Sequence, residues 1–234
     1  MRYYATPSTE QVRDAIKAGH LGAIATPAQG NRLDDLPALA FDSGCYGKGY
    51  PGDAEYLRWL GKMLPVASRC RFATAPDVVG DAAATLQRSA PFLPVIRALG
   101  YAVAFVAQNG LEVSPAPWGA FDVLFIGGLP ECPPCGYVRP LTEKKRKRCP
   151  HCGRLLADWK LGPQARELAR EAKRRGIWVH MGRVNSGKRL RYADHIGCDS
   201  ADGTYIRFGP DTNLPKLRGW VRSVNDQGVL WKAS

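Results

Sequence analysis

The amino-acid sequence predicts an α/β fold, a compact (β/α)8 TIM-like barrel that takes up the whole chain of 234 residues as one domain, 1–234. The first observation is that short apolar runs alternate with amphipathic stretches, which is the pattern of strands alternating with helices. The second is the number of apolar runs, because eight parallel strands close a barrel. The predicted strands span residues 3–5, 21–25, 39–41, 71–74, 102–107, 123–126, 177–180 and 196–198.

Helices are expected between most of these strands. A Ser8 cap precedes the first helix, and Pro91 and Pro94 interrupt the third. The predicted helices span residues 9–18, 53–64, 82–99, 163–175 and 188–195. The linker between the fifth and sixth strands has little room for a helix. An open doubly wound sheet is the alternative, but no Gly-x-Gly-x-x-Gly or Walker loop follows any strand, which argues against its nucleotide-binding versions.

The charge of the chain indicates a polyanionic partner. The formal net charge is +12 and the pI is about 9.6, and the basic residues gather in clusters. These clusters lie at residues 144–148, 173–175, 183 and 188–191. They suit contacts to phosphate groups, although solvated helix faces have the same composition. We therefore expect a nucleic acid as the partner.

The remaining composition indicates a cytoplasmic protein without a membrane partner. No apolar run is long enough to span a bilayer, and no secretory signal is apparent. Cys45, Cys70 and Cys198 have no regular spacing. They are interpreted as reduced thiols in a cytoplasmic compartment.

The other four cysteines form a doubled motif. Cys132-Pro-Pro-Cys135-Gly and Cys149-Pro-His-Cys152-Gly enclose a short segment that ends in a run of basic residues. Four thiolates at this spacing suit a tetrahedral Zn²⁺ ion, and such a site is structural because it has no open coordination position. Two disulfides and a redox Cys-x-x-Cys are the alternatives. The pattern predicts an inserted zinc ribbon with a basic tip over residues 129–157.

Polar residues follow most of the predicted strands. Asp42 follows the third strand, Asp77 the fourth and Gln108 the fifth, and Asp202 lies beyond the eighth. Each has an ordinary interpretation as a turn or a helix cap. The carboxyl ends of barrel strands line the active site, however, so we expect these side chains to meet in one site.

The order of these motifs resembles that of the guanine transglycosylases, barrel enzymes that exchange guanine in a nucleic acid for a 7-deazaguanine base. The resemblance runs over most of the chain. The segments at 41–44, 105–110, 126–129, 180–182 and 197–202 are similar to the family's Asp-Ser-Gly-Gly-Phe, Val-Gln-Gly-Gly, Gly-Gly-Leu, Leu-Met-Gly and Gly-x-Asp-x-x-Asp motifs. Cys45 stands where the family has a second glycine, and the family's Pro-Thr-Arg after the nucleophile is absent.

The resemblance implies a role for each matched residue. Asp202 is implied to be the nucleophile, and Asp42 the general acid and base. The residues implied to bind the base are Asp77, Gln108, Gly127, Gly128 and Met181. The implied chemistry is a double displacement through a covalent glycosyl intermediate.

The likeness is closest to the short phage and bacterial proteins that perform this exchange on DNA. The transfer-RNA enzymes are longer and carry their zinc ligands after the nucleophile, whereas here the cysteines precede it. DNA is therefore the expected partner, in the host cytoplasm if the protein is phage-encoded. Transfer RNA is the alternative substrate, and a non-catalytic zinc-ribbon nucleic-acid binder is the third hypothesis. The residues expected to contact nucleic acid are Lys144, Lys145, Arg146, Lys147, Arg148, Lys160 and Arg183.

Overall fold

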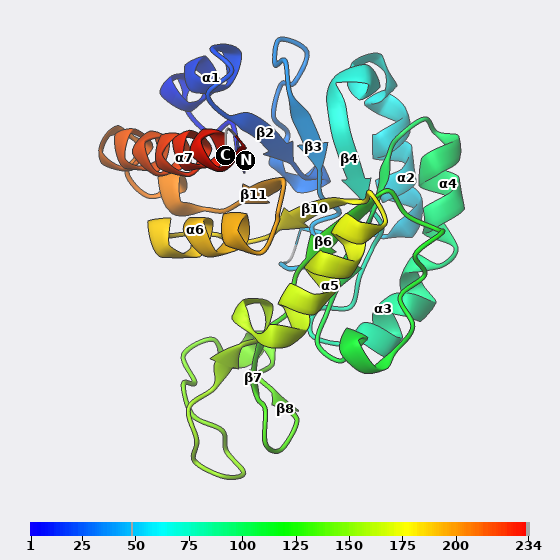
Figure 1. Ribbon diagram of the computed structural model, residues 1–234. Coiled ribbons are helices and arrows are strands. Elements are labelled where there is room, and N and C mark those ends of the chain that lie inside the picture. Colours follow the sequence, from blue (N-terminus) through cyan, green and yellow to red (C-terminus); the bar gives the residue numbers. More distant parts are fainter. Residues whose placement is uncertain (48, 233–234) are drawn as a thin grey trace.

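The computed structural model describes residues 1–47 and 49–232. Eight strands close a barrel in the order β1-β11-β10-β6-β5-β4-β3-β2, and every neighbouring pair is parallel (Figure 1). The predicted (β/α)8 TIM-like fold is confirmed. The barrel strands are β1 (Arg2–Ala5), β2 (Gly22–Ala25), β3 (Leu39–Phe41), β4 (Cys70–Thr74), β5 (Val103–Ala107), β6 (Val123–Ile126), β10 (Trp178–Met181) and β11 (Ser200–Asp202).

Helices surround this barrel. The α-helices are α1 (Glu10–Lys17), α2 (Asp53–Lys62), α3 (Ala82–Ser89), α4 (Phe92–Ala98), α5 (Pro163–Arg174), α6 (Gly187–His195) and α7 (Pro210–Lys232). Short 3-10 helices are η1 (Pro27–Gln29), η2 (Leu64–Arg69), η3 (Leu111–Val113), η4 (Leu141–Glu143), η5 (Trp159–Leu161) and η6 (Tyr205–Arg207). As expected, the linker from β5 to β6 contains only η3.

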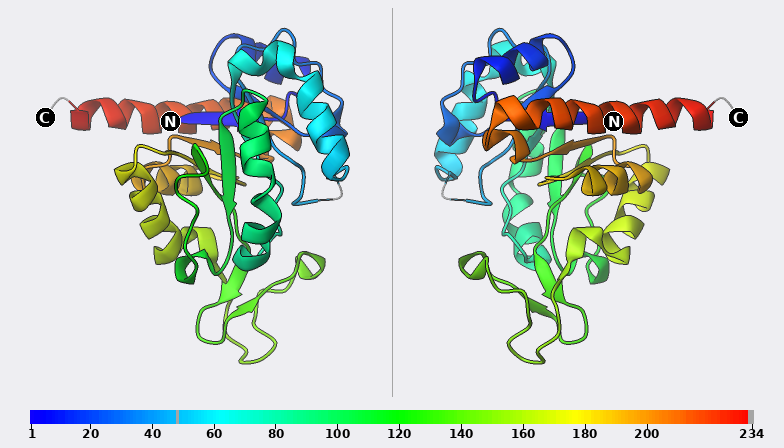
Figure 2. Two further views of the ribbon diagram at one scale, coloured as in Figure 1. Left: turned by 90° about the vertical axis from the view of Figure 1, so that its right-hand side faces the viewer. Right: turned by 90° about the vertical axis from the view of Figure 1, so that its left-hand side faces the viewer.

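Two details of the helices differ from expectation. The side chain of Thr9, not Ser8, caps α1 by accepting a hydrogen bond from the Val12 N–H. The long helix α7 was not predicted, because Pro215 and Gly219 interrupt its helical pattern in the sequence. Figure 2 shows α7 running along one side of the barrel, where it packs against α1 and α6.

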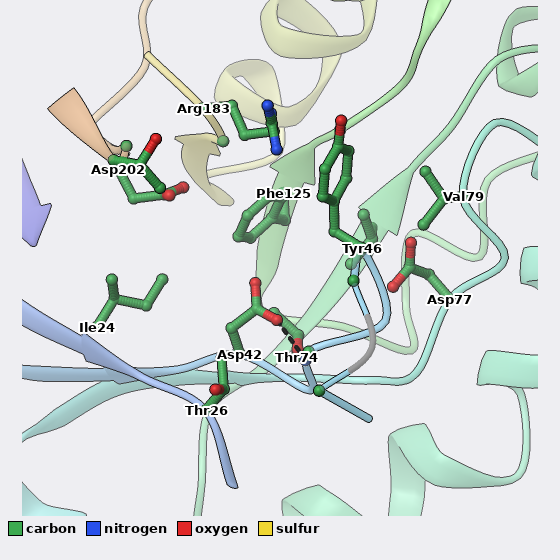
Figure 3. A pocket seen from close by; sticks show the side chains of 18 of the residues that line it. Ile24, Thr26, Asp42, Tyr46, Thr74, Asp77, Val79, Phe125, Arg183 and Asp202 are labelled. Atoms are coloured by element: carbon green, nitrogen blue, oxygen red, sulfur yellow. Dashed lines mark hydrogen bonds between the residues drawn. The ribbon is translucent and has the colours of Figure 1, made fainter. Parts of the chain in front are cut away.

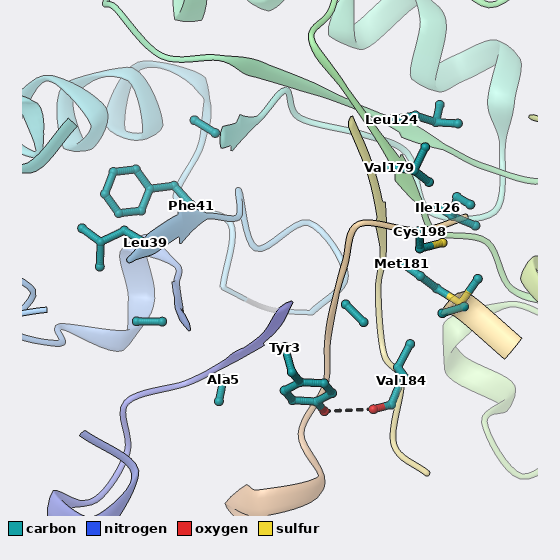
Figure 4. Packing of buried hydrophobic residues seen from close by; sticks show 14 of the residues in the cluster. Tyr3, Ala5, Leu39, Phe41, Leu124, Ile126, Val179, Met181, Val184 and Cys198 are labelled. Atoms are coloured by element: carbon teal, nitrogen blue, oxygen red, sulfur yellow. Dashed lines mark hydrogen bonds between the residues drawn. The ribbon is translucent and has the colours of Figure 1, made fainter. Parts of the chain in front are cut away.

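The alternation of side chains along each strand creates two apolar clusters. Tyr4, Phe72 and Phe125 fill the inside of the barrel together with smaller residues. Strand residues that alternate with the inner ones belong to a second, larger cluster, which includes Phe41, Ile126 and Met181 (Figure 4). Successive strand residues face opposite sides. This alternation decides which residues beyond the strand ends can reach a site inside the barrel mouth.

The last barrel strand lies later in the sequence than predicted. The prediction placed it at 196–198, but Ile196 is the C-cap of α6, and Gly197 turns the chain with a φ of +92°. The strand follows at Ser200–Asp202 and pairs with β1 and β10. As a result Asp202 is the final residue of a barrel strand, not part of a loop beyond one.

A small antiparallel sheet interrupts the barrel between β6 and α5. It consists of β7 (Pro130–Cys132), β8 (Tyr137–Val138) and β9 (Ala157–Asp158) in the order β8-β7-β9. Figure 2 shows this segment projecting from one end of the barrel. Since it begins four residues after the end of β6, that end is the one at which the barrel strands have their carboxyl termini. We call residues 130–158 the ribbon.

Within the described part of the chain, none of the helices combines the length and the apolar character that crossing a bilayer requires.

Candidate active site

A cavity of about 380 Å³ opens at the carboxyl ends of the barrel strands (Figure 3). It is lined by eight of the residues that the sequence analysis singled out for catalysis, base binding or nucleic-acid contact. These residues are Asp42, Asp77, Gln108, Gly127, Gly128, Lys160, Arg183 and Asp202. The barrel therefore brings together groups that are up to 160 positions apart in the sequence.

Asp202 is held by a histidine inside the barrel. Nε2 of His180 lies 3.0 Å from Oδ1 of Asp202. Nδ1 of the same ring lies 2.9 Å from the hydroxyl of Ser200, which also accepts a hydrogen bond of 2.9 Å from the indole N–H of Trp178. The imidazole is fully buried and packs between the rings of Phe72 and Phe125.

This chain of hydrogen bonds selects one tautomer of His180. The Asp202 carboxylate can only accept, so the ring proton lies on Nε2 of His180, which points at it. In that tautomer Nδ1 accepts from the Ser200 hydroxyl, whose oxygen in turn accepts from the Trp178 indole N–H. One oxygen of Asp202 is thereby occupied, and the other stays available to react.

Asp42 lies between Asp202 and Asp77 in the view of Figure 3. Its Oδ1 accepts a hydrogen bond of 2.6 Å from the Gly44 N–H. Burial raises the pKa of Asp42 to about 6, the charge of Asp202 adds to this rise, and the Gly44 hydrogen bond opposes it. A carboxyl group with this pKa can both give and take a proton near neutral pH.

Asp77 and Gln108 form a buried polar edge of the cavity. The Gln108 amide N–H donates to Oδ2 of Asp77 at 2.6 Å, while its carbonyl accepts from the N–H groups of Gly80 and Gly128. Burial raises the pKa of Asp77 to about 7, and the charge of Asp42 contributes to the rise. The Gln108 orientation is thus fixed by backbone groups on two loops, which leaves Asp77 as a positioned donor or acceptor.

Two glycines keep this edge open. A Cβ atom on Gly127 would lie 3.0 Å from Nε2 of Gln108. Gly128 has a φ of +84°, and a Cβ atom there would lie 2.5 Å from the ring of Trp159. A side chain at Gly127 would therefore displace Gln108, which lines the cavity, and one at Gly128 would collide with Trp159.

Cationic groups also line the cavity. The Lys160 side chain is buried, and its ammonium donates to the Gly182 carbonyl at 2.8 Å. Burial and the charges of Arg189 and Arg183 lower the pKa of Lys160 to about 8. Arg207, which follows β11, also lines this cavity.

Arg183 and Tyr46 meet at the cavity from opposite loops. The Arg183 guanidinium lies 3.9 Å from the centre of the Tyr46 ring, a cation–π contact. Arg183 is the only non-glycine residue in the described ranges 1–47 and 49–232 with a positive φ, at 58°. Such backbone strain in a non-glycine residue concentrates at functional sites.

The structure does not bring every predicted site residue into the cavity. Met181 is fully buried, but it lies in the outer apolar cluster against the helices (Figure 4). Its neighbour His180 faces inward instead, because strand residues alternate. Met181, which was predicted to bind the base, therefore does not line this cavity. The five basic residues of the ribbon, Lys144, Lys145, Arg146, Lys147 and Arg148, are exposed and do not line the cavity.

The four motif cysteines of the ribbon meet at one point. Their sulfur atoms all lie within 4.8 Å of one another, and the closest pairs, Cys132 with Cys152 and Cys135 with Cys149, are 3.4 Å apart. Tetrahedral zinc with bonds of about 2.3 Å would separate its sulfur ligands by about 3.8 Å. Gly136 and Gly153 each have a φ of +71° after their motif, so the two motifs turn in the same way. The cluster can hold a metal ion.

Sequence reasoning missed several residues of the site. His180, Ser200 and Trp178 were not assigned a role behind Asp202, and Tyr46 and Arg207 were not assigned to the cavity at all. Strict alternation along 178–181 would have directed His180 into the barrel once the strand was recognised. Nothing in the sequence near Tyr46 or Arg207 indicates that their loops cover the strand ends.

Comparisons with known proteins identify the fold class. No protein-family model matches this chain, and no curated protein does. Among solved structures, the BexX/CysO complex of Amycolatopsis orientalis contains a chain that is similar at 17% identity, with a TM-score of 0.56, over 98% of this chain and 89% of that one. A 3-hexulose-6-phosphate synthase from Salmonella typhimurium is similar at 11% identity, with a TM-score of 0.47, over 97% and 99% of the two chains. At 17% identity, the likeness to the first of these structures concerns the fold alone.

Proposed function

We propose that this protein is a DNA guanine transglycosylase, a glycosyltransferase that exchanges guanine in DNA for a 7-deazaguanine base. One observation supports the proposal above all others. The side chains of Asp42, Asp77, Gln108 and Asp202 line a single cavity together with Gly127. They come from the ends of five different strands, and they are the residues to which the family resemblance assigns catalysis and base recognition.

In the first displacement Asp202 attacks the sugar of the target guanosine. Oδ2 of Asp202, the oxygen without a hydrogen bond to His180, forms a bond to C1′ while the bond from C1′ to the guanine nitrogen breaks. The departing guanine takes a proton from Asp42, whose pKa of about 6 leaves a fraction of the group protonated near neutral pH. The product of this step is a covalent glycosyl-enzyme ester on Asp202.

In the second displacement the ester is replaced by the incoming base. The 7-deazaguanine nitrogen attacks C1′ and gives its proton to the Asp42 carboxylate, and the bond from C1′ to Asp202 breaks. Two inversions at C1′ retain the β-configuration of the nucleoside. Asp42 thus ends the cycle protonated, as it began.

The base is recognised along the Asp77 edge in this proposal. Guanine and 7-deazaguanine both present an N–H group and an exocyclic amino group beside a carbonyl oxygen. The Asp77 carboxyl group and the backbone at Gly127 and Gly128 line the same cavity and offer acceptors and donors for these groups. The target nucleoside must leave the duplex to reach them, because C1′ of a stacked pair is covered.

We assign a structural Zn²⁺ ion to the cluster of Cys132, Cys135, Cys149 and Cys152. The spacing of the sulfur atoms fits four thiolate ligands, and such an ion would cross-link the ribbon without taking part in the reaction. The basic run at 144–148 belongs to the same ribbon and would contact DNA phosphates. The reaction would occur in the cytoplasm, that of the host if the protein is phage-encoded.

Base exchange with labelled guanine tests the proposal directly. The purified protein is incubated with radiolabelled guanine and either guanine-containing duplex DNA or transfer RNA, and label in the polymer is counted. Incorporation into DNA, lost in Asp202→Asn, is the expected result. A carboxamide has the size of a carboxylate but is a poor nucleophile, so the variant is a matched control.

Each other outcome selects an alternative. Incorporation into transfer RNA alone would make the protein a transfer-RNA guanine transglycosylase. Binding of nucleic acid without incorporation into either polymer would favour the non-catalytic zinc-ribbon protein. Incorporation that persists in Asp202→Asn would remove Asp202 from the reaction.

A further inference from the structure

Lys160 is a buried cation that forms no ion pair with any of the described residues. Its side chain is buried, and its ammonium group donates to one carbonyl, that of Gly182. The nearest acidic residue in sequence, Asp158, is ion-paired with Arg189 instead. In the part of the chain that the structure describes, no carboxylate forms an ion pair with Lys160. A buried charge is normally compensated by an opposite charge, so the missing partner of Lys160 is an anion.

The surroundings of Lys160 add further positive charge. Arg183 and Arg207 line the same cavity as Lys160. Arg183 follows β10 and Arg207 lies in η6 after β11, and these strands occupy the seventh and eighth positions of the barrel in chain order. In TIM barrels the loops after these two strands frequently hold a phosphate group.

We propose that the part of the cavity at the carboxyl ends of β10 and β11 is a phosphate subsite, in which Lys160, Arg183 and Arg207 hold the phosphodiester next to the target nucleoside. The inference that the phosphate belongs to a nucleic acid rests on the proposed function. The inference that the cavity has an anion subsite does not. The subsite lies beside Asp202, which lines the same cavity. A phosphate bound there would hold the attached sugar against the nucleophile.

The electrostatics of Lys160 agree with this subsite. Burial and the guanidinium groups of Arg189 and Arg183 lower its pKa to about 8, against the opposing charges of Asp158 and Asp202. An anion between these cations would stabilise the charged ammonium and reverse that shift. The bound anion would thus become the ionic partner of the Lys160 ammonium group.

Binding measurements by calorimetry test the subsite without using base exchange. The ligands are inorganic phosphate, ribose 5-phosphate and a trinucleotide with a central deoxyguanosine, the last also with its two linkages replaced by uncharged methylphosphonates. The variant is Lys160→Met, which keeps the length of the side chain and removes its charge. The control is Lys216→Met, since Lys216 is exposed on α7 and does not line the cavity.

We expect Lys160→Met to bind inorganic phosphate and the charged trinucleotide about tenfold or more weakly than the wild type, in line with the loss of a charged hydrogen bond. Affinity for the methylphosphonate trinucleotide should hardly change, and Lys216→Met should bind like the wild type. Arg207→Met, a change at an exposed position, gives the same comparison if Lys160→Met does not fold.

The remaining outcomes separate the two proposals. Lys160-dependent binding of ribose 5-phosphate, without binding of the trinucleotide, would support the subsite and overturn the nucleic-acid substrate. Equal affinities of wild type, Lys160→Met and Arg207→Met for every phosphate ligand would overturn the subsite, whatever the result of the base-exchange assay.

Discussion

The Nε2 atom of His180 lies 3.0 Å from Oδ1 of Asp202 and donates to this carboxylate, which can only accept, while Nδ1 on the other side of the ring lies 2.9 Å from the Ser200 hydroxyl. The carboxylate is therefore held by one oxygen from inside the barrel. This arrangement orients the proposed nucleophile before any substrate is present.

Replacement of His180 should slow the formation of the covalent intermediate. In His180→Phe the ring still packs between Phe72 and Phe125, but Asp202 loses its donor. We expect a fall of about 10- to 100-fold in kcat with little change in KM, which corresponds to one charged hydrogen bond. Single-turnover kinetics measure the effect, and His180→Gln, which keeps an N–H group, should recover part of it. Equal rates in His180→Phe and the wild type would contradict a positioning role.

Protonation of Asp42 should control the first displacement. Burial raises its pKa to about 6, so adduct formation should fall about tenfold per pH unit above that value, because only the protonated group can assist the leaving guanine. In Asp42→Asn this pH dependence should disappear, turnover should be lost, and a slowly formed covalent adduct should accumulate on a denaturing gel. Unimpaired turnover in Asp42→Asn would refute the acid/base role.

The buried carboxyl group of Asp77 should make the fold less stable at neutral pH than at acidic pH. Its folded-state pKa of about 7 lies above the ordinary value of 3.8, so stability is greatest below that ordinary value and declines as the pH rises through about 7. Asp77→Asn should therefore raise the free energy of unfolding by up to about 4 kcal/mol at pH 8, and by much less at pH 5. Denaturant unfolding at both pH values measures this. A gain that does not depend on pH would rule out ionisation as its cause.

The purified protein should contain close to one zinc ion per chain. Cys132→Ser should lose the ion and unfold the ribbon, while the barrel stays folded because the ribbon is a separate small sheet. Elemental analysis gives the metal content, and amide hydrogen exchange compares residues 130–158 with the barrel strands. Cys198→Ser, a change in the outer core of the barrel, should keep its zinc. A metal-free ribbon with fully protected amides would argue against the assignment.

The basic run of the ribbon should contribute affinity for DNA without sequence preference. We expect a triple alanine variant at Lys144, Lys145 and Lys147 to flatten the slope of log K against log salt by up to about 2.7, since each phosphate contact contributes about 0.9. These three lysines are exposed and make no ion pair within the described residues, so the ribbon itself should stay intact. Turnover at saturating DNA should barely change. A control variant that combines Lys62→Ala with Lys216→Ala should leave the slope unchanged. An unchanged slope in the triple variant as well would indicate that the basic run points away from the substrate.

The sequence was sufficient for most of the barrel because most of its strands are short apolar runs between polar segments. The predicted bounds of β3 and β6 agree with the structure. The last strand was misplaced for a physical reason: Ser200 and Asp202 face the inside of the barrel, where the site needs polar groups. The apolar Ile196 to Cys198 stretch nearby matched the strand pattern better. Sequence patterns predict secondary structure least well at candidate functional sites, where residue types that break the pattern are required.

The candidate site was predictable as a set of residues but not as a geometry. Polar residues at strand ends pointed to Asp42, Asp77 and Gln108 because a barrel gathers its strand ends in one place. The direction of a side chain depends on the register of its strand, and so Met181 was chosen where His180 faces inward. The burial of Lys160 depends on how η5 packs after the ribbon, which no local pattern in the sequence reports.

The pairing of Pro130 with Asp158 joins the two ends of the ribbon as neighbours in one sheet. The chain leaves the barrel and returns to it at a single place, anchored by the hydrogen bonds between Asn109 and the backbone of Leu129. If the residues between these two ends were deleted, a short turn could still connect the ends. The ribbon could therefore be removed or replaced as one unit, and the order of the eight barrel strands along the chain would stay the same.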